Sequence, residues 1–175
     1  MSHICYSGDT TAVFEDEQLA HTLELWAMTR PGWDPELAGT LLDMFAINPK
    51  KKPSKLSRGQ RSAFYATLGL ASRAAVTIFD EVHLGMDAVV REIFYRTLLA
   101  DYTKHPRAFI ISSHLIEEIE KLLDHVIMVD QGKIIESGDV DDVRARYSQD
   151  GKVRDFTEIL MHLTLTDNQR LALGQ

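Results

Sequence analysis

Val76-Thr77-Ile78-Phe79-Asp80-Glu81 is an apolar run that ends in two carboxylates. A stretch with helical spacing follows, from about Ala88 to Tyr102, and then a second apolar run from Ala108 to Ser112. Strand, helix and strand in this order predict a right-handed parallel crossover. Open α/β folds bind ligands at the carboxyl ends of such strands, so Asp80 and Glu81 are predicted to lie at a ligand-binding edge.

Upstream of this unit, Ser57-Arg58-Gly59-Gln60 predicts the start of a helix that runs to about Ser72. The four residues fit a capping box, in which the Ser57 hydroxyl accepts from the N–H of Gln60 and the Gln60 side chain accepts from the N–H of Ser57. Nearer the N-terminus, residues 3–7 predict the end of a strand. Two helices should follow, the second capped by Asp34.

Downstream, residues 115–123 have helical spacing. Residues 126–129 and 134–135 predict a hairpin that closes the sheet. The stretch from 141 to 175 predicts charged helices and carries no clear chemical motif.

Composition narrows the class of protein. The chain has 175 residues, 45% of them apolar and 26% charged, enough to bury one core. It has no signal-peptide pattern at its start and no apolar run of about 18 residues, which predicts a cytoplasmic protein. The single cysteine, Cys5, excludes an internal disulfide and a multi-cysteine zinc site. A net charge of -7 argues against nucleic acid as a partner bound through bulk electrostatics.

Taken singly, the motifs have ordinary explanations. Asp80-Glu81 could be a strand followed by a polar loop, His114 a capping or surface histidine, and Ser57 to Gln60 a well-capped helix. Their shared order and spacing are much harder to obtain by accident.

Together the motifs resemble the ATP-binding-cassette (ABC) ATPases. Leu56 to Gln60 resembles the signature usually written LSGGQ, and Asp80-Glu81 follows it at about the Walker B spacing. Leu84 to Asp87 resembles the D-loop and Ser112 to His114 the switch segment. The similarity spans roughly residues 4 to 138 and is to transporter-type ATPases of Gram-positive bacteria.

The resemblance implies an α/β fold: a partial P-loop NTPase (ABC ATPase) fold with a parallel-sheet core and a helical subdomain. Residues 1–9 would form a strand and the start of the Q-loop, and residues 10–52 the helical subdomain. Residues 53–140 would form a RecA-like catalytic subdomain, and residues 141–175 a C-terminal helical extension.

It also implies roles for the residues of an ATP and Mg²⁺ site. Asp80 would hold Mg²⁺, usually through water, because this hard ion prefers oxygen ligands. Glu81 would orient or deprotonate the attacking water. His114 would reach the γ-phosphate as a donor or positioning group.

In this family the signature acts in trans. Ser57, Arg58, Gly59 and Gln60 would bind a phosphate of ATP on the opposite subunit, through N–H groups at the positive end of a helix. Asp87 would help to couple the two sites. The implied partners are a second ATPase subunit, identical or different, and a transmembrane transporter subunit that holds the protein peripherally on the inner face of the cell membrane.

Several positions depart from the family pattern. No stretch of the sequence fits the P-loop G-x-x-x-x-G-K-[ST], which a family member would carry upstream of the first residue here. Asp9 stands where the family has the Q-loop glutamine. Arg58 replaces the first glycine of the signature, and Val82 replaces the proline after Glu81.

Four functions stay open from the sequence. The first two are a catalytic part of a transporter ATPase that needs a P-loop region, and a non-catalytic module that supplies the signature to a partner. The other two are a DNA-repair or translation ABC ATPase, and a metal-dependent hydrolase that does not use a nucleotide.

Without a P-loop strand, the strands at Val76 and Ala108 are expected to lose a neighbour and expose apolar surface, which favours self-association.

Overall fold

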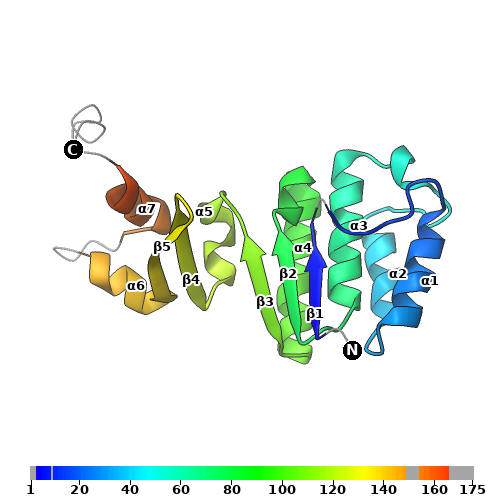
Figure 1. Cartoon of the computed structure of the whole chain (residues 1–175), viewed down its shortest axis with the longest axis horizontal. Helices are drawn as coiled ribbons and strands as arrows, with labels where there is room; N and C mark the ends of the chain where they lie inside the picture. Colours follow the sequence, from blue (N-terminus) through cyan, green and yellow to red (C-terminus); the bar gives the residue numbers. More distant parts are fainter. Residues whose placement is uncertain (1–2, 9, 149–153, 166–175) are drawn as a thin grey trace. The chain divides into compact units, whose positions relative to one another are not determined.

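A computed structural model describes residues 3–8, 10–148 and 154–165. The chain divides into two compact units, residues 1–113 and residues 114–175, and each is described by itself (Figure 1). The division lies inside the segment 53–140, and the subdomain boundaries expected from the sequence stay predictions. Within the described ranges, no helix has the length and apolar character needed to cross a membrane.

The first unit contains a parallel three-stranded sheet in the order β1-β2-β3, formed by Ile4–Ser7, Val76–Asp80 and Ala108–Ser112. The predicted parallel strands are therefore present. The expectation that the strand at Val76 lacks a neighbour was wrong, because β1 and β3 pair with its two edges. Only one edge of β3 is paired among the described strands, as expected for the strand at Ala108.

Helices α3 and α4 cover one face of this sheet (Figure 1). The Phe79 ring of β2 packs edge-on against Phe94 of α4, with ring centroids 5.2 Å apart. Gly69 of α3 lets that helix approach, since a β-carbon there would lie 2.5 Å from a Phe79 ring atom. The helices of the unit are α1 Leu19–Thr29, α2 Pro35–Met44, η1 Pro53–Lys55, α3 Arg58–Ala71, η2 Val82–Gly85 and α4 Ala88–Lys104.

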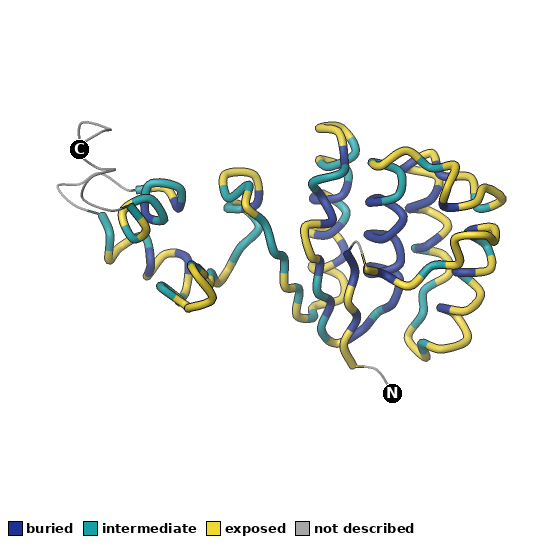
Figure 2. Tube along the Cα trace, turned by 45° about the horizontal axis from the view of Figure 1, so that its top comes forward, coloured by how far each residue is buried: buried dark blue, intermediate teal, exposed yellow. Residues whose placement is uncertain are grey.

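Helix α3 is the centre of the unit, because every residue from Ser62 to Ala71 is buried (Figure 2). The other face of the sheet is uncovered in the described part of the chain. Ile4, Tyr6 and Ile110 point to that face and are 56%, 40% and 53% exposed. The sheet thus leaves apolar side chains in solvent, as the sequence led us to expect.

The second unit packs two helices against a hairpin. Its elements are α5 Ile116–Ile119, η3 Glu120–Leu122, β4 His125–Asp130, β5 Lys133–Asp139, α6 Val140–Tyr147 and α7 Phe156–Thr164. Met128, Val140, Val143, Phe156 and Ile159 form its core.

Two expectations about this unit need correction. The hairpin does not close the first sheet: β4 and β5 form a separate antiparallel pair. Gln131 and Gly132, with φ of 47° and 76°, make the tight turn that joins the two strands to each other. The helix expected over 115–123 is one short α turn followed by a 3₁₀ turn.

Candidate active site

Asp80 lies at the carboxyl end of β2, and both its oxygens accept hydrogen bonds from the neighbouring strands. The Ser112 hydroxyl of β3 donates to Oδ1, and the Tyr6 hydroxyl of β1 donates to Oδ2 over 2.8 Å. The hydrogen bond from Ser112, followed by that from Tyr6, lowers the pKa of Asp80. The carboxylate is therefore ionised at neutral pH and fixed in position.

Glu81 follows directly and has a left-handed backbone, with φ of 49°. Such a conformation is uncommon for a residue with a side chain and costs on the order of 1–3 kcal/mol. Its N–H lies 3.3 Å from the Ser112 carbonyl oxygen and 3.1 Å from the Ser112 hydroxyl. Ser112 thus holds both acidic residues of the turn.

His83 was not singled out from the sequence. It is fully buried in η2, and its Nε2 lies 2.8 Å from the hydroxyl of Ser113. This contact joins the segment after Glu81 to the residue before His114. His114 itself is the first residue of the second unit, so its role beside the γ-phosphate stays a prediction.

The capping box at the start of α3 is confirmed. The Ser57 hydroxyl accepts from the N–H of Gln60 over 3.1 Å, and Gln60 Oε1 accepts from the N–H of Ser57 over 3.4 Å. The first turn leaves the N–H groups of Arg58 and Gly59 for an acceptor outside the helix. Together with the positive end of the helix dipole, these groups suit a phosphate.

The first turn of α3 lies in contact with the residues at the end of η2. A β-carbon on Gly59 would lie 3.1 Å from the carbonyl oxygen of Gly85, so the first turn of α3 rests on the end of η2. Asp87 caps α4, and its Oδ1 accepts from the N–H groups of Val89 and Val90. The structure therefore gives Asp87 a capping function, and its coupling role stays a prediction.

The residues present fit a magnesium ion held mainly through water. In the described ranges, no group of three or more histidine, cysteine or acidic side chains could enclose a metal. A single ionised carboxylate, Asp80, agrees with Mg²⁺, which keeps several waters and is completed by substrate phosphates. Asp9, expected in the Q-loop, lies outside the described residues.

Tyr6 is, with His83, a residue of the site that the sequence did not indicate. The stretch Ile4 to Ser7 was read only as a strand, and nothing in its sequence marks a polar contact. The signal is in the register: Tyr6 pairs with Ile78, two residues before Asp80 on the same face of β2.

The chain is similar to known proteins in sequence and in structure. No protein-family model matches the chain. It is 26% identical over 117 residues to the ABC transporter ATP-binding protein YtrB of Bacillus subtilis, covering 67% of this chain and 40% of YtrB. It is 25% identical over 153 residues to the methionine import ATP-binding protein MetN of Haemophilus influenzae, covering 86% of this chain and 44% of MetN.

The chain thus spans less than half the length of these two relatives. Among solved structures, an ATP-binding subunit of an ABC transporter superposes with a TM-score of 0.81 at 21% identity, covering 93% of this chain and 69% of that one. A nucleotide-free ATP-binding cassette gives a TM-score of 0.61 at 18% identity, covering 78% and 61%. In sequence the chain is similar to ABC transporter ATP-binding proteins, and it has the α/β fold of their ABC ATPase domains, of which it spans a part.

Proposed function

We propose that the chain carries the signature, Walker B, D-loop and switch regions of an ATP-hydrolysing subunit that drives transport through a membrane partner. The observation that carries the proposal is the paired carboxylates Asp80 and Glu81, with Asp80 held ionised by Tyr6 and Ser112 at the edge where α/β sheets bind ligands.

Asp80 would hold Mg²⁺ through water, and the ion would neutralise charge on the phosphates of ATP. Glu81 would orient the attacking water or accept its proton, which is worth about 10²–10⁴ in rate. His114 would position the γ-phosphate. Ser112 has a supporting role, because it fixes the side chain of Asp80 and the backbone of Glu81 together.

The first turn of α3 would bind ATP held by a second subunit, through the N–H groups of Arg58 and Gly59. Ser57 and Gln60 keep that turn formed, and Asp87 would couple the two sites. A protein working in this way would be cytoplasmic and peripheral on the inner face of the membrane, attached through its transmembrane partner. Nucleic acid is not expected as a partner, given the net charge of -7.

The test is phosphate release from Mg²⁺-ATP by the 175-residue chain, alone and joined at residue 4 to the P-loop-bearing N-terminal segment of a relative. We expect turnover only in the joined protein, and its loss in Glu81→Gln. Glu24→Gln, on the exposed surface of α1, is the matched control and should keep full activity. Turnover by the joined protein that survives Glu81→Gln would overturn the proposed catalytic role.

A non-catalytic module that supplies the signature to a partner is the second candidate. It is favoured by the intact capping box together with an aspartate, Asp9, at the position of the Q-loop glutamine. In this case the chain would stimulate a partner ATPase, and Ser57→Arg would abolish the stimulation while Glu81→Gln would leave it unchanged.

A further inference from the structure

A pocket of about 670 Å³ opens at the end of the first unit where the strands begin. His3 precedes β1, Ala75 precedes β2, and Arg107 precedes β3, and all three line it. Asp80 lies at the other end of β2, a five-residue strand, and each residue of a strand advances about 3.3 Å. The pocket is therefore separate from the Asp80 site.

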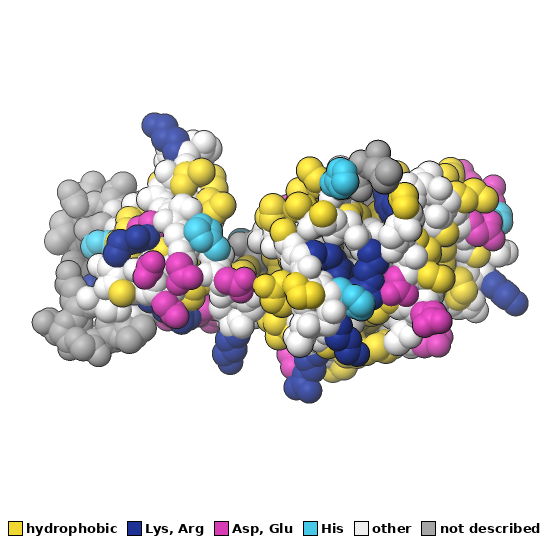
Figure 3. Space-filling view, turned by 90° about the horizontal axis from the view of Figure 1, so that it is seen from below, with side chains coloured by type: hydrophobic (Ala, Val, Ile, Leu, Met, Phe, Trp, Pro, Cys, Tyr) yellow, Lys and Arg dark blue, Asp and Glu magenta, His cyan; other side chains and the backbone are white. Residues whose placement is uncertain are grey.

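The lining is cationic. It includes Arg30, Arg73, Lys104 and Arg107, and no aspartate or glutamate of the described chain is among the lining residues. Basic side chains and histidine gather on this end of the unit in Figure 3. The volume lies within the range of small-molecule sites, about 300–1,000 Å³.

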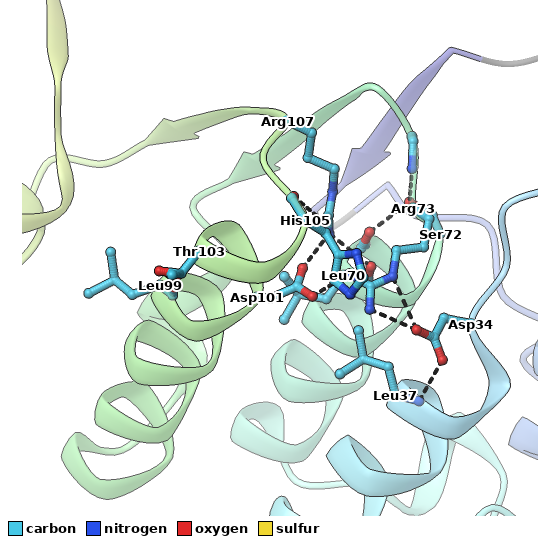
Figure 4. Close-up of polar contacts among 12 residues, drawn as sticks. Asp34, Leu37, Leu70, Ser72, Arg73, Leu99, Asp101, Thr103, His105 and Arg107 are labelled. Atoms are coloured by element: carbon cyan, nitrogen blue, oxygen red, sulfur yellow. Dashed lines mark hydrogen bonds and ion pairs between the residues drawn. The ribbon is translucent and has the colours of Figure 1, made fainter.

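Part of this charge has a structural explanation. Arg73 pairs with Asp34 over 2.7 Å and also with Asp101, while Arg107 pairs with Asp101 over 2.7 Å (Figure 4). Arg107 also donates to the carbonyl oxygen of Leu70 at the end of α3. The guanidinium groups of Arg73 and Arg107 are therefore paired with the carboxylates of Asp34 and Asp101.

In the part of the chain that the structure describes, two basic groups of the lining, Arg30 and Lys104, have no carboxylate partner, and Arg107 has one nitrogen to spare. Arg30 lies over the Trp26 ring, 3.4 Å from its centroid, and donates to Thr29. Neither Arg30 nor Lys104 forms an ion pair with a carboxylate in the described ranges. The side chain of Arg107 is 7% exposed, and its Nε is buried without a hydrogen-bond partner among the described residues. A buried donor without a partner is costly, and an acceptor bound in the pocket beside Arg107 would remove that cost.

We propose that this pocket binds a small phosphorylated molecule, with Arg30 and Lys104 as its anion-binding groups and the Nε–H of Arg107 as a further hydrogen-bond donor. Planar guanidinium groups match phosphate oxygens in bidentate fashion, and a lysine adds a mobile charge. The pocket is much larger than one phosphate group, which leaves room for an organic part. Burial raises the pKa of the Cys5 thiol on the same wall, so this group adds no competing negative charge.

The test is a calorimetric titration of the purified chain with inorganic pyrophosphate in the presence of a metal chelator. The chelator removes Mg²⁺, so the outcome does not depend on Asp80 or on the proposed ATPase function. Arg30→Gln with Lys104→Gln removes two charges from the pocket without touching the buried pairs of Asp101. Arg96→Gln with Lys50→Gln removes two exposed charges elsewhere and is the matched control.

We expect saturable binding that weakens about tenfold or more in the pocket double variant and is unchanged in the control. No saturable binding, or equal loss in both double variants, would overturn the proposal. Binding that survives in the pocket variant and disappears in Ser57→Arg would assign the anion to α3 instead, and would also overturn it.

Discussion

The hydroxyl of Tyr6 donates a hydrogen bond of 2.8 Å to Oδ2 of Asp80, from the strand beside it. With Ser112 on the opposite neighbour, it lowers the pKa of this carboxyl group. The three strands of the sheet thus each supply one member of the site. The order β1-β2-β3 is what brings the three side chains together.

Ser112→Ala and Tyr6→Phe are each expected to raise the pKa of Asp80 toward its ordinary value, Ser112→Ala by more. The pKa of Asp80 is lower in the folded state than in the unfolded state. These hydrogen bonds therefore stabilise the fold fully at a pH above the pKa of the unfolded state, which is about 3.9. The stabilisation is lost as the pH falls through the folded value. NMR titration of the carboxyl carbon measures the pKa directly. Tyr102→Phe on α4 is the control, and an unchanged Asp80 titration in Tyr6→Phe would contradict the assignment.

Ser57→Ala is expected to destabilise the fold by about 1 kcal/mol, because it removes the side-chain acceptor for the Gln60 N–H. Ser57→Asp should retain most of the stability, since aspartate also caps helices. Urea denaturation followed by circular dichroism gives the free energy of unfolding. Ser54→Ala, exposed in η1, should change it little, and an equal loss in both alanine variants would argue against the cap.

Asp101→Asn is expected to be far more costly, about 3–5 kcal/mol, because it leaves two largely buried guanidinium groups without their shared partner. The side chain of Asp101 is 5% exposed and pairs with both Arg73 and Arg107. The same denaturation experiment applies, with Asp43→Asn on the surface of α2 as control. A loss below about 1 kcal/mol would mean that solvent or another group replaces the carboxylate.

The purified chain is expected to self-associate through the open edge and apolar face of β3, where Ile110 is 53% exposed. Ile110→Lys adds a charge to that face and should shift the population toward monomer in sedimentation velocity. Met28→Lys changes an even more exposed residue on α1 and should leave association unchanged. A monodisperse native monomer would refute this expectation.

The sequence predicted best where local chemistry decides the structure. Asp34 and Ser57 cap helices with their own side chains, so their contacts involve residues only three positions away. The parallel strands were predictable because Val76 to Asp80 and Ala108 to Ser112 are apolar runs around a helical stretch. The order of motifs along the chain also carried the family resemblance.

Long-range contacts were not predictable in the same way. Tyr6 meets Asp80 across 74 positions of sequence, and its partner is set by strand register. His83 of η2 contacts Ser113, 30 positions further along the chain, and no periodicity in the sequence indicates this contact. The hairpin was assigned to the wrong sheet because the alternation of apolar and polar residues predicts a strand but does not predict which strand pairs with it.

The contact between Gly59 and Gly85 has a mechanical consequence. With a carbonyl oxygen 3.1 Å from the place of a β-carbon, the two backbones leave no layer of side chains between them to absorb a displacement. A phosphate that draws the first turn of α3 outward by a few tenths of an ångström would shift the support under η2. The occupancy of a nucleotide bound at this turn would then be transmitted, through backbone alone, to the segment that follows Glu81, the residue proposed to activate water.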